Sequence, residues 1–402
     1  MRPHRSLPLV AVFAALLGSS ALLAQQPFVG SRSAGMAGAS VAVAEDATAL
    51  WINPAGLSRS ERPDLDVFAG AVATDRGRFL STADGLSRLD PRGLAGDPAG
   101  LAAAVADLRR MAAPGTGVVG SGAGGLVFVW KGLALGIGDL AYAGVYPNVD
   151  LTHILPGADP ASGIRFNTTA LREAGLEARE VRLGLSRALF QGVLLLGVTA
   201  RYVAGRATYT NVGVFAADVS SPLAILRRAL RENVERTNRF AVDAGALVNI
   251  LGKVRVGIVS TALNAPTFSV KRDPGNPELL GAPDALRLPR TLRAGAEFAP
   301  IGPLTVAVDG DLIRTETLVP GARSQQLSGG LELRLPLFAV RVGAFRDFAA
   351  IDPHWAVSAG FGIGLPVVSV DAAFVASTHG GPSLSASNQR DIGASFSTRF
   401  RF

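Results

Sequence analysis

The stretch DIGASFSTRFRF, residues 391–402, decides the fold of this chain. Its alternate residues divide into an apolar set and a polar or charged set, with Thr398 as the one polar member of the apolar set. Because alternate side chains of a strand point to opposite faces of a sheet, one face here is apolar and the other is wet. The segment therefore predicts a membrane-spanning strand whose terminal aromatics lie at the lipid–water interface. The apolar set is Ile392, Ala394, Phe396, Phe400 and Phe402.

The same alternation recurs upstream, where charged residues keep to one face of each strand-like segment. A charge on the lipid side near the bilayer midplane would cost about 2 to 4 kcal/mol, so the charged face is assigned to the lumen. Acids and bases then alternate between neighbouring strands, which predicts a cross-strand ladder. For this set, structural charge pairing is favoured over a catalytic or ligand site. The predicted ladder is Arg293, Glu297, Asp309, Asp311, Glu332, Arg334 and Arg341.

About fourteen such segments follow one another, an even number within the range of bacterial barrels. Short turns such as 251–252 and 300–303 are expected to face the periplasm, and the longer stretches 82–116, 147–176 and 268–287 the outside. The predicted fold class is all-β, a closed antiparallel transmembrane barrel of about 14 strands. The segments begin near Asp64, Gly122, Leu133, Glu177, Gly192, Asn238, Lys253, Arg287, Pro303, Ser324, Phe338, Trp355, Val367 and Gln389.

The first residues predict a secretory signal peptide. Arg2 and Arg5 precede an apolar run that ends in small residues. The run has about a dozen residues, which is too short for a helix that crosses a bilayer. Cleavage is expected after Ala24, with Ala21 as the alternative. The expected organisation is a signal peptide over residues 1–24, an N-terminal plug over 25–62 and a barrel over 63–402.

Composition limits the other classes of function. The mean hydropathy is +0.31, yet no later window offers 18 uncharged apolar residues, which suits strands better than membrane helices. The chain has no Cys, which excludes disulfides and thiolate metal sites. The formal net charge is +7, but the basic residues are scattered singly, so nucleic-acid binding is not expected. Anionic lipopolysaccharide or an anionic solute would suit this charge equally well.

The sequence offers no pattern that predicts catalysis. Apart from His4 in the signal, His153, His354 and His379 lie far apart in predicted loops. The H-E-x-x-H, G-x-S-x-G and Walker motifs do not occur. We therefore expect no catalytic residue, no metal and no cofactor.

Two inserts have helical periodicity, 100–111 and 221–237. In the second, Ser221 can cap a helix and Pro222 suits its first turn. An amphipathic helix at this place would touch lipid headgroups or lie over the barrel mouth. Packing against neighbouring loops is the favoured alternative.

The stretch 30–57 is dominated by small residues, which lets a backbone pack tightly in a confined space. The dipeptide Asn53-Pro54 favours a turn. Its glycines do not have G-x-G-x-x-G spacing and no strand precedes them, so a nucleotide site is not predicted. The residues singled out here are Gly35, Gly38, Asp46, Asn53, Pro54, Ala55 and Gly56.

This stretch resembles the N-terminal signature of the FadL superfamily of outer-membrane barrels. The wording is most similar to the conjugal-transfer TraF-like and PorV/PorQ-like branches, in which a Gly-rich stretch leads through an acidic A-x-D-A-t-A turn to N-P-A-G-L. The acidic strand 308–312 and the terminal Phe extend the likeness along most of the chain. The residues that match the motif as they stand are Ala44, Asp46, Ala47, Ala49, Asn53, Pro54, Ala55 and Gly56.

The resemblance implies a bacterial outer-membrane barrel of fourteen strands whose plug blocks the lumen. Transporting members of the family admit hydrophobic ligands such as fatty acids and release them through a side opening. We therefore expect transport or binding of small hydrophobic molecules resembling long-chain fatty acids. The alternative is a non-transporting accessory of a secretion or conjugation apparatus. Aromatic residues make up only 6% of this chain, and no cluster in the sequence identifies the apolar pocket that a transporter needs.

The expected partners follow from the same resemblance and from the membrane location. They are outer-membrane lipid, lipopolysaccharide and the barrel-assembly machinery, together with a hydrophobic small molecule or a secretion or conjugation partner. Phe400 and Phe402 resemble the terminal signal by which that machinery recognises barrels.

Overall fold

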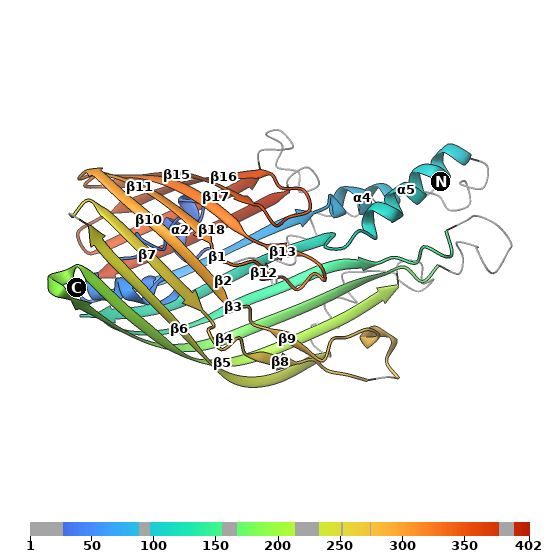
Figure 1. The fold of residues 1–402 in the computed structure, drawn as a ribbon, viewed down its shortest axis with the longest axis horizontal. Coiled ribbons are helices and arrows are strands. Elements are labelled where there is room, and N and C mark those ends of the chain that lie inside the picture. The colour runs from blue at the N-terminus through green and yellow to red at the C-terminus, as the bar shows by residue number, and fades with distance from the viewer. Residues whose placement is uncertain are drawn as a thin grey trace.

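The computed structural model describes residues 27–87, 97–154, 167–213, 233–250, 252–273, 275–377 and 390–402. Over these residues the chain forms a closed barrel of fourteen antiparallel strands (Figure 1). The predicted fold class and strand number are therefore confirmed. In the part of the chain that the structure describes, no helix is long and apolar enough to cross a membrane.

Consecutive barrel strands pair with each other, and the last closes on the first with Asp64 opposite Arg401 and Thr74 opposite Asp391. The barrel strands are β1 (Asp64–Arg76), β2 (Gly117–Trp130), β3 (Leu133–Asn148), β4 (Ala170–Leu189), β5 (Leu194–Gly213), β6 (Val234–Ile250), β7 (Val254–Thr261), β10 (Thr291–Ile301), β11 (Leu304–Asp311), β14 (Gln326–Arg334), β15 (Phe338–Asp347), β16 (Trp355–Gly364), β17 (Val368–Ser377) and β18 (Asp391–Arg401).

The strands alternate as their sequence patterns predict. On β3, Leu133 and Ile137 point outward and are 55% and 53% exposed, whereas Ala134 points inward and is buried. On β18, Phe396 is 53% exposed on the outer face. An exposed row of large apolar side chains is the surface that a lipid bilayer covers.

Several strands start earlier than their sequence patterns predict. The start of β4 lies at Ala170 instead of Glu177, and β2 starts at Gly117 instead of Gly122. The expected loop 147–176 is therefore partly strand. Residues 173–176 are buried without alternation, so their sequence carries no period-two signal.

Two further boundaries are corrected by the structure. The wall strand β10 starts at Thr291, because Arg287 belongs to a small hairpin of β8 (Thr267–Ser269) and β9 (Ala285–Arg287). Residues 234–237, the end of the predicted helix 221–237, are the start of β6. The preceding residues 221–232 lie outside the described part of the chain. The remaining small elements are β12 (Thr315–Glu316), β13 (Arg323–Ser324), η4 (Phe190–Gly192) and η5 (Pro277–Leu279).

The two ends of the barrel differ in the length of their connections. At one end, which we call the short-turn end, strands join through turns such as 131–132 and 302–303. At the other, the long-loop end, the connections carry α4 (Phe79–Ser87), α5 (Pro98–Met111) and the β8–β9 hairpin (Figure 1). The predicted helix 100–111 is confirmed as α5, and Asp97 caps it by accepting the Gly100 N–H at 2.9 Å.

The N-terminal segment, residues 27–63, lies inside the barrel, where the wall strands surround it (Figure 1). It contains α2 (Gly30–Gly35), α3 (Ala49–Ile52) and η1 (Pro54–Arg59), and most of its residues are buried. The wall strands present glycines to it at places where a Cβ atom would come within 3 Å of its atoms. Glycine usually weakens a strand, and the close approach of the N-terminal segment explains why glycine occupies these positions of the wall. The glycine band consists of Gly136, Gly138, Gly184, Gly197, Gly245, Gly330 and Gly343.

Candidate functional site

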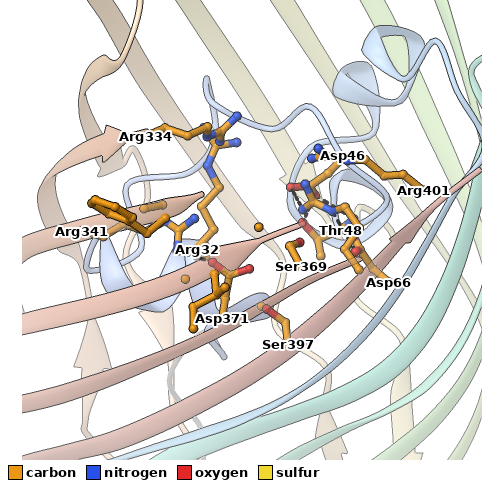
Figure 2. A pocket seen from close by; sticks show the side chains of 18 of the residues that line it. Arg32, Asp46, Thr48, Asp66, Arg334, Arg341, Ser369, Asp371, Ser397 and Arg401 are labelled. Atoms are coloured by element: carbon orange, nitrogen blue, oxygen red, sulfur yellow. Dashed lines mark hydrogen bonds and ion pairs between the residues drawn. The ribbon is translucent and has the colours of Figure 1, made fainter. Parts of the chain in front are cut away.

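The described residues line two prominent cavities inside the barrel, one on each side of the N-terminal segment. The larger has a volume of about 330 Å³ and is lined by the turn residues 334–339 and 362–366, so it lies at the short-turn end (Figure 2). The smaller has a volume of about 100 Å³ and is lined by residues near the opposite ends of β7, β10 and β11. Residues of the N-terminal segment therefore lie between the two cavities.

The larger cavity is rich in arginine. Arg32 of the N-terminal segment and Arg341 of β15 point into it (Figure 2). Arg334 and Arg401 stand at its mouth with side chains that are 44% and 47% exposed. Leu335 and other turn residues supply an apolar rim. Arginine side chains and an apolar rim thus both line this chamber, which opens at the short-turn end.

Asp46 fastens the N-terminal segment to the last strand. Its carboxylate accepts a hydrogen bond from Arg399, whose Nε also donates to Asp66 of β1 at 2.9 Å. The other oxygen of Asp46 accepts the N–H of Thr48 at 3.0 Å. Burial alone would raise the pKa of Asp46, but the charges of Arg399 and Arg32 hold it below its ordinary value. This carboxylate is ionised at neutral pH and holds the segment by charge.

A second fastening joins Glu45 of the N-terminal segment to Glu332 of β14. Arg32 lies between them, 2.9 Å from each carboxylate. Burial alone would raise the pKa of Glu45, but the surrounding arginines hold it well below its ordinary value. The other arginines of this network are Arg59, 2.8 Å from Glu45, Arg334, 3.1 Å from Glu45 and 2.8 Å from Glu332, and Arg341, 2.7 Å from Glu332.

These lowered pKa values predict how the N-terminal segment responds to acid. A carboxylate whose pKa is lower in the folded state stabilises that state above its ordinary pKa, and this stability is lost as the pH falls through the folded value. The ordinary values are 3.8 for Asp46 and 4.5 for Glu45. We expect the barrel to stay closed to ions from neutral pH down to about pH 4 and to open progressively below it.

Ion conductance of single barrels in a planar bilayer, recorded as the pH on the short-turn side is lowered, measures this response. The Glu45→Gln variant is the control, and it is expected to conduct already at neutral pH. A wild-type barrel that opens between pH 7 and pH 5 would contradict the assignment to these two carboxylates.

A third buried network, the lumenal quartet, holds the N-terminal segment from the other side of the barrel. It consists of Glu180, Arg182, Arg201 and Asp243, whose side chains are no more than 3% exposed. Arg182 lies 2.7 Å from Glu180, and Arg201 lies 3.0 Å from Asp243. The guanidinium of Arg182 also stacks on Trp51, 3.6 Å from the ring centroid. The quartet was not among the predicted residues, although two of its members, Glu180 and Arg182, alternate with the apolar Val181 and Leu183 in the sequence.

The seven residues of the predicted charge ladder occupy inward-facing positions on their strands, and Arg334 stands at the mouth. Two cross-strand pairs form between members of this set, Arg293 with Asp311 at 3.0 Å and Arg341 with Glu332 at 2.7 Å. Glu297 pairs with Arg255 of β7. Asp309 instead accepts the main-chain N–H groups of Ser40 and Val41 at 2.7 and 2.8 Å. The set is thus divided between wall pairs and anchors of the N-terminal segment.

The motif residues of the N-terminal segment have structural reasons for their type. Asn53 is fully buried; its amide donates to the Val41 carbonyl at 3.1 Å, and its oxygen accepts the Ala55 N–H at 3.2 Å. Pro54 opens η1. A Cβ on Gly56 would lie 2.4 Å from the Ala44 carbonyl oxygen. Gly38 has φ +86°, and Gly35 packs against Arg341 and Gly360.

A thin partition separates the two cavities. Four residues of the N-terminal segment line both of them, namely Val29, Ser33, Ser40 and Ile52. The hydroxyl groups of Ser33 and Ser40 are joined by a hydrogen bond of 3.2 Å. This hydroxyl pair is therefore part of the barrier between the two cavities.

The smaller cavity has one apolar side that the sequence did not reveal, and Arg182, Arg201 and Arg293 line it as well. Leu140 and Tyr142 of β3 line it together with Leu288 and Pro289, which precede β10. Trp51 contributes from the N-terminal segment. These residues are far apart in the chain, so no local pattern could have grouped them. Only the closure of the barrel brings them together.

The described histidines are held by aspartates at the long-loop end. The Nδ1 of His153 is 2.8 Å from Asp150, and the Nε2 of His354 contacts Asp391. Burial alone would lower the pKa of His354, but the hydrogen bond and charge of Asp391 raise it above its ordinary value. His379 lies outside the described residues. Phe400 and Phe402, the expected assembly signal, are exposed at the short-turn end, by 39% and 72%.

No protein-family model matches this chain, and no curated protein is similar to it in sequence. Solved structures are similar over nearly its whole length. The CymD monoaromatic hydrocarbon channel is 15% identical, with 93% of this chain and 97% of that one covered and a TM-score of 0.53. A FadL homologue of Pseudomonas aeruginosa is 12% identical (95% and 99% covered, TM-score 0.52). The toluene transporter TbuX of Ralstonia pickettii is 13% identical (93% and 98% covered, TM-score 0.53). At these identities, the likeness shows that the chain has the fold of FadL-type barrels.

Proposed function

We propose that this protein is a channel of the bacterial outer membrane through which small hydrophobic molecules enter the periplasm. The observation that carries the proposal is the pair of cavities inside the barrel, separated by a partition of four residues. Barrels of the same fold are described as a monoaromatic hydrocarbon channel and a toluene transporter. Short turns of such barrels face the periplasm, so the larger cavity is the exit chamber.

The size and lining of the smaller cavity favour a compact ligand. Its volume is about 100 Å³, and Leu140, Tyr142 and Leu288 provide apolar contacts. In another protein, an apolar cavity of about 150 Å³ binds benzene. A ligand of roughly one ring fits this chamber, whereas a long acyl chain would extend beyond it. Fatty-acid-like molecules, which the family resemblance implies, are therefore the comparison ligand in the test below.

We assign the N-terminal segment the role of plug, and the division into signal peptide 1–24, plug 25–62 and barrel 63–402 is part of this proposal. The Ser33–Ser40 hydrogen bond is the part of the barrier that we infer to open, since a neutral hydrogen bond contributes only about 1 kcal/mol net. Its opening connects the smaller chamber to the larger one. A hydrophobic molecule then passes from the smaller chamber to the larger one and leaves toward the periplasm.

A disulfide across the partition tests this route. The chain has no Cys, so the Ser33→Cys/Ser40→Cys variant has no competing thiol. With the two hydroxyl oxygens 3.2 Å apart, the two side chains are near enough for a bond after a small shift. We expect the oxidised variant to take up labelled toluene into proteoliposomes no faster than protein-free vesicles do, and a reductant to restore wild-type uptake. The same assay is run with a labelled long-chain fatty acid.

Ser33→Cys alone is the control, and oxidant is expected to leave its uptake unchanged. Equal uptake by the oxidised and reduced double variant would rule out the partition as the route. Wild-type vesicles that take up neither ligand faster than empty vesicles would contradict transport itself.

The alternative of a non-transporting accessory rests on the TraF-like and PorV/PorQ-like wording of the N-terminal motif. In that case we propose that the arginine-rich mouth at Arg334 and Arg401 receives an acidic envelope partner. A pull-down from outer membranes compares the wild type with an Arg334→Gln/Arg401→Gln variant. Recovery of the same proteins with both would leave this alternative without support.

A further inference from the structure

A group of charged side chains stands on the outside of the barrel wall, where the strands otherwise present apolar residues. We call it the outer charge cluster. Arg179 is 61% exposed and Asp139 is 48% exposed, so neither faces the lumen. Asp139 and Arg179 lie an even number of residues from Ile137 and Val181 on the same strands, so they point to the same outer face. The cluster consists of Asp139 of β3, Glu177 and Arg179 of β4, and Arg206 of β5.

Adjacent strands place these residues directly beside one another. Asp139 is opposite Arg179 across β3 and β4, and Glu177 is opposite Arg206 across β4 and β5. The ion pairs are Arg179 to Glu177 at 2.9 Å, Arg179 to Asp139 at 3.4 Å and Arg206 to Glu177 at 2.8 Å. The exposed Arg236 of β6 lies opposite Arg206 and adds a third cation. Three guanidinium groups thus face outward beside two carboxylates, which leaves an excess of positive charge.

The cluster lies at the edge of the apolar belt. Ile137 and Val181, 53% and 47% exposed, are the last large apolar residues before Asp139 and Arg179. On the next strands Tyr202 and Phe240 make an edge-to-face contact of 5.5 Å. Outward aromatic residues form a girdle at the boundary of the hydrocarbon layer. The outer charge cluster therefore lies just beyond this boundary, toward the long-loop end.

At that depth the surrounding medium is the headgroup layer of the outer leaflet. Charges are costly inside hydrocarbon, and ion pairs in water contribute little to stability, so neither environment explains the cluster. Guanidinium groups bind phosphate with two parallel hydrogen bonds. The ion pairs of Arg179 use its Nε and Nη2, and more than half of its side chain is exposed. Carboxylates such as Asp139 suit divalent cations, which also bind phosphate.

We propose that the outer charge cluster binds the phosphate groups of lipopolysaccharide in the outer leaflet. Arg179 and Arg206 hold the phosphate, and Tyr202 and Phe240 contact the acyl chains below it. The site fixes the depth of β3 to β6 in the bilayer. This inference rests on the outer-membrane location proposed above, and it is independent of whether the barrel transports.

The experiment uses the purified full-length mature protein in detergent, with the thermal unfolding midpoint read from heat-dependent gel mobility. Three additions are compared: lipopolysaccharide, the same lipid with its phosphates removed, and inorganic phosphate. We expect only intact lipopolysaccharide to raise the midpoint of the wild type, and at least half of this rise to be lost in Arg179→Gln/Arg206→Gln. Arg187→Gln is the matched control, since Arg187 has the same outward parity on β4 near the short-turn end. It is expected to keep the full rise.

The variants also show whether folding alone explains the result. Without lipid, the double glutamine variant is expected to have the same midpoint as the wild type. Should it fold poorly, Arg179→Lys/Arg206→Lys keeps the charges but not the bidentate geometry, and it is expected to show a reduced rise. An equal rise in wild type and double variant overturns the proposal, as does a rise with the dephosphorylated lipid. A full rise with inorganic phosphate shows an anion site without lipid recognition, which also overturns it. Transport is measured separately by uptake, so either proposal can fail alone.

Discussion

Replacing Gly330 with alanine is expected to unseat the N-terminal segment and open the barrel, whereas the same change at Gly329 is expected to leave it closed. A Cβ on Gly330 would lie 2.6 Å from the Met36 Cβ and 2.8 Å from the Met36 carbonyl oxygen. On Gly329, which faces the other side of β14, the nearest atom would be 3.8 Å away. The obstructing atoms at Gly330 include backbone, which no rotamer change can move. Overpacking of this kind costs about 1 to 3 kcal/mol per site.

A second substitution strengthens the effect. A Cβ on Gly343 of the neighbouring strand would lie 2.6 Å from the carbonyl carbon of Met36. We expect Gly330→Ala/Gly343→Ala to show steady ion conductance in planar bilayers and fast entry of small sugars into proteoliposomes. Gly329→Ala is expected to match the wild type in both assays. If the Gly330→Ala barrel remains closed to ions, the N-terminal segment accommodates the added methyl group without leaving the barrel. In that case the glycine band does not determine the position of the segment.

The glycine band shows why the fold could be predicted while the seat of the N-terminal segment could not. Period-two alternation needs only the side chains of one strand, so segments such as 391–402 identified the wall directly. A glycine such as Gly330 is, in the sequence, only a weak strand residue. Glycine is needed at this position because Met36 packs against it. Met36 is far away in the chain and contacts Gly330 only when the barrel has closed.

The charged residues show the same limit. The alternation of side chains along the strands predicted that Asp309 and Arg341 face the lumen, and in the structure both face it. The partner of Asp309 is the backbone of Ser40 and Val41, which no strand pattern contains. Parity also fails for Arg179, which faces outward. Charged residues are confined to the lumenal face only where the hydrocarbon layer covers the wall, and β4 extends beyond that layer.

The lumenal quartet supports the second large effect. Asp243→Asn is expected to lower the free energy of unfolding by about 3 to 5 kcal/mol, since it leaves two buried guanidinium groups with one carboxylate. Arg182 and Arg201 are 3% and 2% exposed, so water cannot replace the lost charge. Urea-dependent folding into lipid vesicles measures the change. The control is Asp284→Asn, which removes a pair with Arg272 whose side chains are 82% and 62% exposed. An exposed pair contributes about 0 to 1 kcal/mol, so this variant is expected to remain near wild type.

We attribute the destabilisation by Asp243→Asn to unbalanced buried charge and not to the loss of one contact. A compensating variant separates these two causes. Asp243→Asn/Arg182→Met removes one charge of each sign and leaves Glu180 with Arg201. Because a buried pair replaced by apolar groups is often neutral, most of the lost stability is expected to return. Arg182 also stacks on Trp51, so recovery of stability with continued ion leakage would show that this contact holds the N-terminal segment in place. If Asp243→Asn is as mild as Asp284→Asn, water enters the quartet, and the segment is held mainly by Asp46, Glu45 and the glycine band.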